Sequence, residues 1–348
     1  LLFLAAIIKA VNEYQDILRI SAASAANDHR LGANEAPPAI ISIYLGSELT
    51  SILEAIESSG EYVSKTQEKM KSNISFIPEF IKDTTDRNRT SPFAFTGNKF
   101  EFRMLGSSQS ISGPNFVLNT IVAEELRQFA DTLEHANNFD AAVIDIIKNV
   151  VKENKQIVFN GNNYSDEWTK EAERRGLLNL KNTVEALPYF ILKKNIDLFV
   201  THGILTEKEV LSRYEILLEN YWKIINIEAL TTTDIAKKQI IPAVYKYLDA
   251  LSESTLRRQK LAVPIDFSHD IELITKISRL KDKLQAAVNK LDNALCQARD
   301  IEEVEKKAKF YCESVISDMS DVRNASDELE TVVSSEFWPF PTYADLLF

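Results

Sequence analysis

The stretch Asn98-Lys-Phe-Glu-Phe-Arg103 alternates charged and apolar side chains, and it belongs to a longer run, residues 91–105, with the same alternation. Successive side chains of a β-strand point to opposite faces, so the run predicts one strand with an apolar face. Three charged side chains share the other face: Lys99, Glu101 and Arg103. The apolar face needs a core to cover it, and working outward from this strand organises the rest of the chain.

The charged face has two interpretations. A row of mixed charges is commonly a solvated face whose ion pairs join neighbouring strands. However, Arg87 and Arg89 lie just before the strand, and Arg30 and Glu35 lie in a loop rich in Gly and Pro, although the chain as a whole is acidic. A guanidinium presents a planar fork of donors, so such local arginines suit carboxylate and phosphate ligands, and a carboxylate among them suits a divalent cation.

Helical periodicity dominates the remaining sequence. Apolar spacings of three and four predict a helix over residues 1–20, and breaker residues predict a loop over 21–38. An apolar, β-branched run predicts a buried strand at 39–45, followed by a helix at about 48–71 and an irregular stretch to 86. After a helix that starts at Pro114, the pattern predicts only helices, at about 140–153, 166–176, 179–201, 207–228, 233–252, 269–298 and 301–333.

The last two predicted helices carry apolar seams at alternating spacings of three and four, over residues 273–295 and 304–315. A break near Arg299 and Asp300 separates the seams and predicts a long antiparallel helical hairpin. The segment 338–343 has prolines at alternate positions, so it cannot be regular helix, and its aromatic residues are expected to pack on the fold or on a neighbouring subunit. The fold class expected is α+β, a few antiparallel strands with helices followed by a mainly α-helical part.

Composition bounds the class of protein. A chain of 348 residues with 45% hydrophobic residues can bury a core and is expected to form about two domains. Its 40 basic and 51 acidic residues give a net charge of -11, which argues against nucleic acid and anionic membranes as partners. The apolar residues 1–8 are too few for a membrane span. Two cysteines, Cys296 and Cys312, make no disulfide framework, so a reducing, cytoplasmic setting is expected.

Histidines are scattered along the sequence. His135, His202 and His269 show no ligand spacing with Asp, Glu or Cys, so we interpret them as residues on helix surfaces. His29 adjoins Arg30 and is a weak candidate for substrate contact. The segment 160–163 is interpreted as a turn.

Two blocks and the ending of the chain make the sequence resemble a known family. Arg87-Asn-Arg-Thr-Ser-Pro-Phe-Ala-Phe-Thr-Gly-Asn-Lys-Phe-Glu-Phe-Arg103 resembles the glutamine synthetase block that begins with Asn-Arg-Ser and ends with Glu-x-Arg. Upstream, Arg30-Leu-Gly-Ala-Asn-Glu-Ala-Pro37 resembles the family's Arg-Leu-x-x-x-x-Glu-Ala-Pro loop. The ending Trp338-Pro-Phe-Pro-Thr-Tyr-Ala-Asp-Leu-Leu-Phe348 is most similar to the type III branch.

The resemblance implies an organisation and an activity. Residues 1–130 would be the C-terminal portion of a glutamine synthetase catalytic domain, and residues 131–348 a helical type III C-terminal domain. The sequence opens inside an apolar helix without Met, so an upstream portion is expected to be missing. The family is an ATP-dependent ligase that joins ammonia to the γ-carboxylate of glutamate through γ-glutamyl phosphate. It uses two or three Mg²⁺ or Mn²⁺ ions and assembles into large homo-oligomers of stacked rings.

The resemblance also assigns roles to individual residues. Arg30 would bind the substrate carboxylate or the transferring phosphoryl group, and Arg103 would bind glutamate. Glu35 would be the catalytic carboxylate on a flap that closes over the site and accepts the ammonium proton. Arg89 and Lys99 would contact the ATP phosphates, with Arg89 also stabilising charge during phosphoryl transfer.

The resemblance also implies that Glu101 is a metal ligand. At several other positions the sequence departs from the family. The Arg30–Glu35 spacing is one residue shorter than in the commoner types, and Ala94 stands where those types have an arginine. Residues 46–86 replace a short connection. The family's other metal-binding glutamates, its metal-binding histidine and its nucleotide motif are not in this sequence and are expected upstream.

Two alternatives stay open. A related carboxylate–amine ligase, such as a γ-glutamyl-polyamine or γ-glutamylanilide synthetase, would use the same residue types. A non-catalytic helical interaction protein would keep the charged strand as a remnant and bind a partner through the helical hairpin. The upstream sequence would discriminate between these hypotheses, because only an enzyme needs the remaining ligands.

Overall fold

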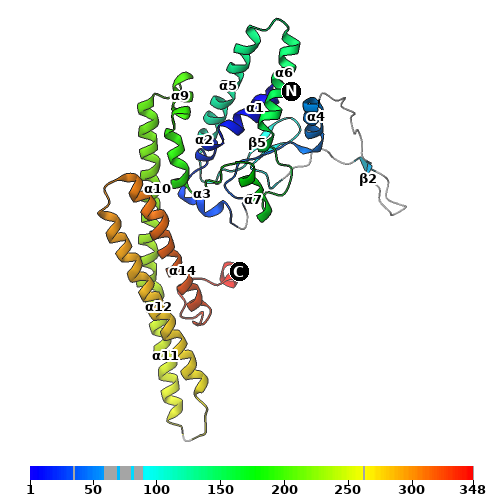
Figure 1. Cartoon of the computed structure of the whole chain (residues 1–348). Coiled ribbons are helices and arrows are strands. Elements are labelled where there is room, and N and C mark those ends of the chain that lie inside the picture. The colour runs from blue at the N-terminus through cyan, green and yellow to red at the C-terminus, as the bar shows by residue number, and fades with distance from the viewer. Residues whose placement is uncertain (34–35, 59–68, 71–79, 82–88, 262, 348) are drawn as a thin grey trace. The chain divides into compact units, whose positions relative to one another are not determined.

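The computed structural model describes residues 1–33, 36–58, 69–70, 80–81, 89–261 and 263–347 (Figure 1). The chain divides into two compact units, Leu1–Tyr214 and Glu215–Phe348. The boundary lies inside one long helix, so each unit is described by itself. None of the described helices is long and apolar enough to cross a membrane.

The first unit is a small sheet surrounded by helices. Its helices are α1 (Leu2–Glu13), α2 (Gln15–Ile20), α3 (Ala25–Arg30), α4 (Gly46–Ser58), α5 (Ser112–Glu134), α6 (Phe139–Asn154), α7 (Asp166–Arg174), α8 (Thr183–Ala186), α9 (Lys193–Thr201) and the start of α10 (Glu207–Ile235), with short η1 (Lys155–Ile157) and η2 (Leu187–Ile191). Helix α1 packs against both α5 and α6 (Figure 1). Ala6 and Ala10 on α1 are fully buried, and their small side chains let these helices approach closely.

The sheet contains β1 (Ile43–Tyr44), β4 (Phe93–Phe95) and β5 (Phe100–Phe102), in the order β1-β4-β5. Strand β1 pairs in parallel with β4, and β4 pairs antiparallel with β5, so that Ala94 lies opposite Glu101. Beyond β1, Val158 forms a parallel bridge to Ile43, and the Phe159 amide donates to the Ile43 carbonyl at 2.9 Å. A second, two-stranded antiparallel sheet joins β2 (Lys69–Met70) and β3 (Phe80–Ile81).

The single strand predicted over residues 91–105 is wrong: the stretch folds into a β4–β5 hairpin. The turn lies at Gly97, whose φ of 96° is rarely adopted by residues with a side chain. The Thr96 amide closes the turn by donating to the Lys99 carbonyl at 2.8 Å. The alternation of apolar and charged residues does not reveal such a reversal, because both strands of a hairpin keep the same period of two.

Other boundaries also differ from the expectation. The predicted loop 21–38 contains helix α3, because the Ser24 side chain caps its start by accepting from the Asn27 amide. The helix predicted at about 48–71 corresponds to α4, Gly46–Ser58, and Lys69–Met70 lies in a strand. Residues 59–68 of that prediction lie outside the described residues. Phe80–Ile81 likewise forms a strand in the stretch expected to be irregular. The buried strand expected at 39–45 is reduced to β1, although residues 39–45 are all buried.

Two predicted helical stretches are divided or joined differently. Residues 179–201 form α8, η2 and α9 instead of one helix, because Asn182 caps α8 and Leu192 adopts an extended conformation. The helices predicted at 207–228 and 233–252 form one continuous helical run. It passes from α10 through a π-helical turn, η3 (Ala236–Ile240), into α11 (Ile241–Gln259).

The second unit is helical, as expected. After α11 it contains α12 (Ser268–Arg299), α13 (Val304–Phe310), the π-helical η4 (Tyr311–Val315), α14 (Ile316–Glu330) and α15 (Tyr343–Leu347). Leu284, Val288 and Leu291 on α12 are completely buried. The predicted antiparallel hairpin is therefore confirmed between α12 and the run from α13 to α14, which turns between residues 300 and 303. A small sheet among helices followed by this helical part confirms the α+β class.

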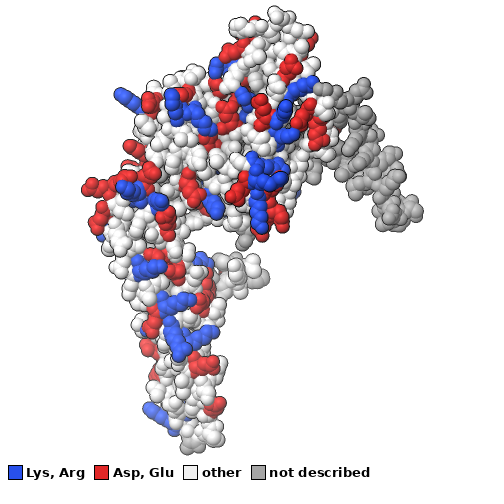
Figure 2. Space-filling model, viewed as in Figure 1, with Lys and Arg blue, Asp and Glu red and all other residues white. Residues whose placement is uncertain are grey.

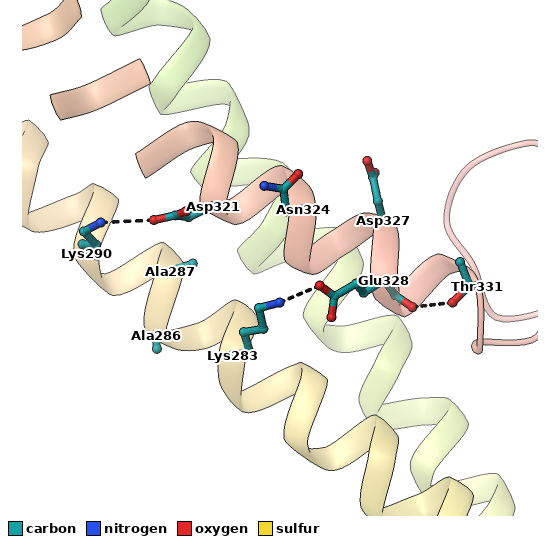
Figure 3. Close-up of a pocket in the computed structure, with 9 residues that line it drawn as sticks. All are labelled: Lys283, Ala286, Ala287, Lys290, Asp321, Asn324, Asp327, Glu328 and Thr331. Carbon is teal, nitrogen blue, oxygen red and sulfur yellow. Dashed lines mark hydrogen bonds and ion pairs between the residues drawn. The ribbon is translucent and has the colours of Figure 1, made fainter. Parts of the chain in front are cut away.

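Exposed ion pairs show the antiparallel direction of the hairpin. Lys283 Nζ lies 2.6 Å from Glu328 Oε1, and Lys290 Nζ lies 3.1 Å from Asp321 Oδ2 (Figure 3). The earlier lysine of α12, Lys283, pairs with the later acidic residue of α14, and Lys290 pairs with the earlier one, so the two helices run in opposite directions. Residues 338–342 are not helical, as predicted, but Tyr343, which the prediction included, begins α15. Just before this segment the Phe337 ring packs on Tyr247 of α11 with centroids 5.4 Å apart.

Candidate functional site

The three charged residues of the β5 segment lie together, as predicted from their alternation. Arg103 donates through Nε and Nη2 to Glu101 Oε2, at 3.1 and 2.9 Å. Lys99 Nζ lies 3.7 Å from Glu101 Oε1. The opposite face is aromatic, and the Phe93 and Phe100 rings stack with centroids 5.1 Å apart. The hairpin therefore holds one carboxylate between two cations on the face away from its aromatic residues.

Arg30 reaches the end of the same hairpin from helix α3. Its Nη2 donates to the carbonyls of Met104 and Leu105, at 2.6 and 3.2 Å, and its Nε donates to Asn27 Oδ1 at 2.9 Å. Met104 follows Arg103 directly in the chain and is fully buried. The Arg30 guanidinium is thus bonded to the backbone directly after Arg103, although Arg30 and Met104 are 74 positions apart in the sequence.

Helix α3 is held in place by a buried ion pair. Arg19, which is 1% exposed, donates through Nε to the Leu180 carbonyl at 2.9 Å, and its Nη2 lies 3.3 Å from Asp28 Oδ1. The other carboxylate oxygen of Asp28 accepts from the Thr183 amide at 2.7 Å. Burial raises the pKa of Asp28, opposed by that amide and by Arg19. The contacts of Asp28 with Arg19 and with the Thr183 amide fix α3 against residues 180–183.

Arg89 lies in the segment that leads into β4, and its side chain is exposed. The next residue is anchored: Thr90 Oγ1 accepts from the Asn163 amide at 3.1 Å. Asn163 is fully buried, and its Nδ2 donates to Ser42 Oγ at 2.9 Å, just before β1. The segment 160–163 is a turn, as expected, but sequence patterns gave no sign that it holds the entry to β4.

Two of the predicted site residues are outside the described part of the chain. Glu35 and Arg87 both lie outside the described residues. Lys99, Glu101 and Arg103 are brought together, and Arg30 is bonded to the backbone directly after Arg103. Arg89 lies at the entry to β4.

Glu101 is the one predicted metal ligand, and its surroundings limit what it can do alone. Across the described ranges, no group of three His, Cys, Asp or Glu residues could hold a metal ion. A carboxylate oxygen suits Mg²⁺ or Mn²⁺, but both oxygens of Glu101 face cations of the same hairpin. The described residues therefore do not form a divalent-cation site by themselves.

A second polar cluster, missed at the sequence level, lies between α1 and α5. Lys9 Nζ is 2.6 Å from Glu125 Oε2, and the Glu125 side chain is completely buried. Burial raises the pKa of the Glu125 carboxyl to about 7. The interpretation of His202 as a surface residue is wrong, because its half-buried ring lies 2.8 Å from the neighbouring carboxylate of Glu124. Hydrogen bonds, first from Arg127, lower the pKa of Glu124 to about 2.

Two cavities in the described parts of the chain, one in each unit, are lined by residues other than the β5 charges. A groove of about 790 Å³ lies between α12 and α14, lined by Ala286, Ala287 and charged residues (Figure 3). A cavity of about 610 Å³ lies between α4, α6 and α7, where Arg174 and Arg175 both pair with Glu171. Acidic and basic side chains are interspersed over the face seen in Figure 2. Neither cavity contains Arg30, Glu101 or Arg103.

Comparison with known proteins finds one matching family and several similar proteins. Residues 142–259 match the family described as glutamine synthetase C-terminal domain. The whole chain is 42% identical to a type-3 glutamine synthetase from Dictyostelium discoideum, covering 48% of that protein. It is 39% identical to a glutamine synthetase from Butyrivibrio fibrisolvens and 37% to one from Bacteroides fragilis (strain YCH46), covering 50% and 49% of them.

The chain spans about half the length of the curated relatives it matches, and each match extends over all of residues 1–348. The family match at residues 142–259 covers helices of both units. The two sequence blocks that carry the resemblance, residues 30–37 and 87–103, lie outside that range. The whole-length matches do include them. Residues 142–259 thus match the glutamine synthetase C-terminal domain, and the chain is similar along its whole length to about half of a type-3 glutamine synthetase.

Proposed function

We propose that the chain is part of a type III glutamine synthetase, an ATP-dependent ligase for nitrogen assimilation. The intact protein joins ammonia to the γ-carboxylate of glutamate through γ-glutamyl phosphate. Its cofactors are ATP and Mg²⁺ or Mn²⁺, and it works in the cytoplasm as a large homo-oligomer of stacked rings. Residues 1–130 contribute to the catalytic domain, and residues 131–348 form the helical type III domain.

One observation carries this proposal. Similarity to glutamine synthetases extends over the whole chain, and within it the structure joins Arg30 to the end of the hairpin that bears Glu101 and Arg103. A solvated face of ion pairs, the alternative at the sequence level, does not require a guanidinium from a helix 70 residues away. A guanidinium held against the backbone just after Arg103, next to the Arg103–Glu101 pair, supports a site for anionic substrates.

Each residue has a role that its chemistry allows. Arg103, half-buried directly after β5, binds glutamate, and Arg30 binds a carboxylate or phosphoryl oxygen. Lys99 has a 67% exposed side chain, and Arg89 is also exposed, so both can reach the phosphates of ATP. Phosphoryl transfer depends mainly on positioning and on stabilising developing negative charge, which these cations supply. Glu35, on the flap, accepts the ammonium proton.

Glu101 contributes one metal ligand, and the remaining ligands come from outside the described residues. The divalent ion neutralises charge on the transferring phosphate when it is bound. The role of Glu101 in this chain is to present a carboxylate whose orientation Arg103 fixes at 2.9 Å.

The test uses the intact protein that contains this chain. Glutamine formation is measured from glutamate, ammonia, ATP and Mg²⁺ for the wild type, for Glu101→Ala and for Glu167→Ala, which replaces an exposed glutamate on α7 as a control. The proposal predicts turnover in the wild type and the control and none in Glu101→Ala. Near-normal turnover of Glu101→Ala with unchanged metal dependence would contradict the metal role.

The same assay separates the alternatives. Ammonia is replaced by a polyamine or by aniline, and product is measured together with ADP. A related γ-glutamyl-amine ligase would use one of these amines in preference to ammonia. A non-catalytic interaction protein would form neither product nor ADP with any of them.

A further inference from the structure

Asn27 connects three parts of the site through one buried amide. It lies on α3 and is 2% exposed. Its Nδ2 donates to the carbonyls of Ala22 and Met104, at 2.6 and 2.9 Å. Its Oδ1 accepts from Arg30 Nε at 2.9 Å. Both donors of the amide are used for backbone carbonyls, and the acceptor is used for the guanidinium.

The hydrogen bonds of Arg30 leave one edge of its guanidinium for a ligand. A guanidinium has five N–H donors in a fixed plane. The Nε donor goes to Asn27, and Nη2 donates to the carbonyls of Met104 and Leu105. Within the described part of the chain, the two donors on Nη1 have no hydrogen-bond partner. Three bonds to fixed acceptors determine the orientation of the plane and therefore the direction of Nη1.

We propose that Asn27 is a positioning residue, which holds the guanidinium of Arg30 against the end of β5 so that Nη1 is presented to an anionic group of the substrate. The ligand is a carboxylate or a phosphoryl group, because the anionic oxygens of both accept charge-assisted hydrogen bonds from a guanidinium N–H. This inference rests on the proposed function, in which Arg30 contacts substrate. Asn27 itself touches no reacting atom.

The two ends of the Asn27 amide distinguish positioning from a simple structural role. The Nδ2 end joins two backbone segments, and the loss of those bonds loosens the fold whatever Arg30 does. The Oδ1 end contacts Arg30, and its loss frees the guanidinium to rotate. Asn27→Asp keeps an acceptor for Arg30 and removes the donors, whereas Asn27→Ala removes both.

A double-mutant cycle on the intact protein tests the proposal. Steady-state kcat and KM for glutamate and for ATP are measured for Asn27→Ala, Arg30→Lys and the double variant. Asn27→Ala is expected to lower kcat/KM by up to about 100-fold, the effect of misplacing a reacting group by about 1 Å. In the Arg30→Lys background, which has no planar fork to orient, Asn27→Ala is expected to cause less than about a threefold further loss.

The matched control is Asn195→Ala. Asn195 is also completely buried, and its Nδ2 donates to Asp16 Oδ2 and to the Tyr189 carbonyl, at 2.9 and 2.7 Å. Thermal unfolding is recorded for every variant. Asn195→Ala is expected to lower the melting temperature about as much as Asn27→Ala while leaving kcat/KM near that of the wild type.

The outcomes separate this proposal from the proposed function. Additive losses in the double variant, or an equal loss in Asn195→Ala, would overturn the positioning role alone. Normal kinetics of Arg30→Lys would remove the role of Arg30, and this inference with it, while turnover itself persisted. A wild type without turnover would overturn the proposed function and this inference together. If Asn27→Ala does not fold, Asn27→Asp decides: retained activity supports the Arg30 contact, and a loss above about tenfold contradicts it.

Discussion

The charges of the β5 segment contribute little to stability, which makes them useful probes of function. Lys99 Nζ lies 3.7 Å from Glu101 Oε1, and the two side chains are 67% and 27% exposed. Ion pairs at the surface stabilise a fold by about 0–1 kcal/mol. Arg103 pairs with Glu101 at closer range but still at the surface. Loss of activity in a Glu101 variant should therefore reflect the site and not unfolding.

The buried pair of Glu125 and Lys9 has the opposite character, and it gives the fold a pH dependence. The folded-state pKa of Glu125 is about 7, above its ordinary value of 4.5, because burial disfavours the charged form. A raised carboxyl pKa adds stability that is complete below pH 4.5 and is lost as pH rises through 7. Lys9, Glu13, Glu124 and Tyr14 are the charged or titratable groups that face it.

We predict that Glu125→Gln removes this dependence. Between pH 5 and pH 8 the wild-type chain should lose about 1–3 kcal/mol of unfolding free energy relative to Glu125→Gln. Urea unfolding of both proteins at the two pH values measures the difference. The neighbouring Glu124 does not contribute to this difference, because its pKa of about 2 keeps it charged between pH 5 and pH 8. Parallel profiles of the two proteins would show that Glu125 does not change charge between these pH values.

Residue contacts of this kind could not be predicted from sequence. The alternation at residues 99–103 correctly grouped Lys99, Glu101 and Arg103, because their contacts are local and follow the period of a strand. Asn27 is hydrogen-bonded to the Met104 carbonyl, 77 positions later in the sequence. Lys9 forms an ion pair with Glu125 on α5, more than 100 positions later. Periodicity shows which side of a helix is buried but not which polar atom on another element will satisfy it.

At the scale of elements, the β4–β5 hairpin depends on the turn at Gly97. Its φ of 96° lies in the region that favours glycine, so Gly97→Ala should destabilise the first unit by about 1–2 kcal/mol. Gly113→Ala, inside helix α5, is the control: it removes a flexible residue from a helix and should be neutral or stabilising by up to about 1 kcal/mol. Thermal unfolding of both variants tests the pair. Equal stability of Gly97→Ala and the wild type would mean that the turn accommodates a side chain.

Helices were more predictable than their ends. The long amphipathic patterns located α6, α12 and the run from α13 to α14 to within a few residues, because burial along one face imposes a period of 3.6. The interruptions were missed where a single residue decides them. Ser24 starts α3 inside a predicted loop, and Leu192 divides a predicted helix. The gap predicted between the helices at 207–228 and 233–252 is absent, because α10 continues through residues 229–232.

The helical hairpin allows a sharp comparison between buried and exposed contacts. Leu291 on α12 is completely buried, so Leu291→Ala should lower the unfolding free energy by about 2–5 kcal/mol. Lys283 pairs with Glu328 across the surface of the same hairpin, and Lys283→Ala should cost less than about 1 kcal/mol (Figure 3). Chemical denaturation of the two variants measures both values. A larger cost for Lys283→Ala would show that the ion pairs, and not the apolar seam, hold the hairpin.

At the scale of the whole molecule, the chain contains only some of what the proposed reaction requires. It supplies three arginines, Arg30, Arg89 and Arg103, together with Lys99 and Glu101. Across its described residues it holds no group of three ligands for a metal ion. The relatives that it matches are about twice as long. The apolar side chains of Leu1 and Phe3, 57% and 69% exposed, suit a surface that other protein covers in the proposed assembly.

The proposal therefore predicts that purified residues 1–348 make no glutamine from glutamate, ammonia and ATP. Cationic side chains can bind phosphate and carboxylate groups, but transfer also needs the divalent ions that orient ATP and neutralise its charge, and Glu101 is one ligand among several. Glutamine and ADP formation by the purified chain, at concentrations where the intact protein is active, is the measurement. A helical circular-dichroism spectrum serves as the control that the chain is folded. Measurable turnover would mean that residues 1–348 hold a complete site, and Glu101 would then need partners within this chain.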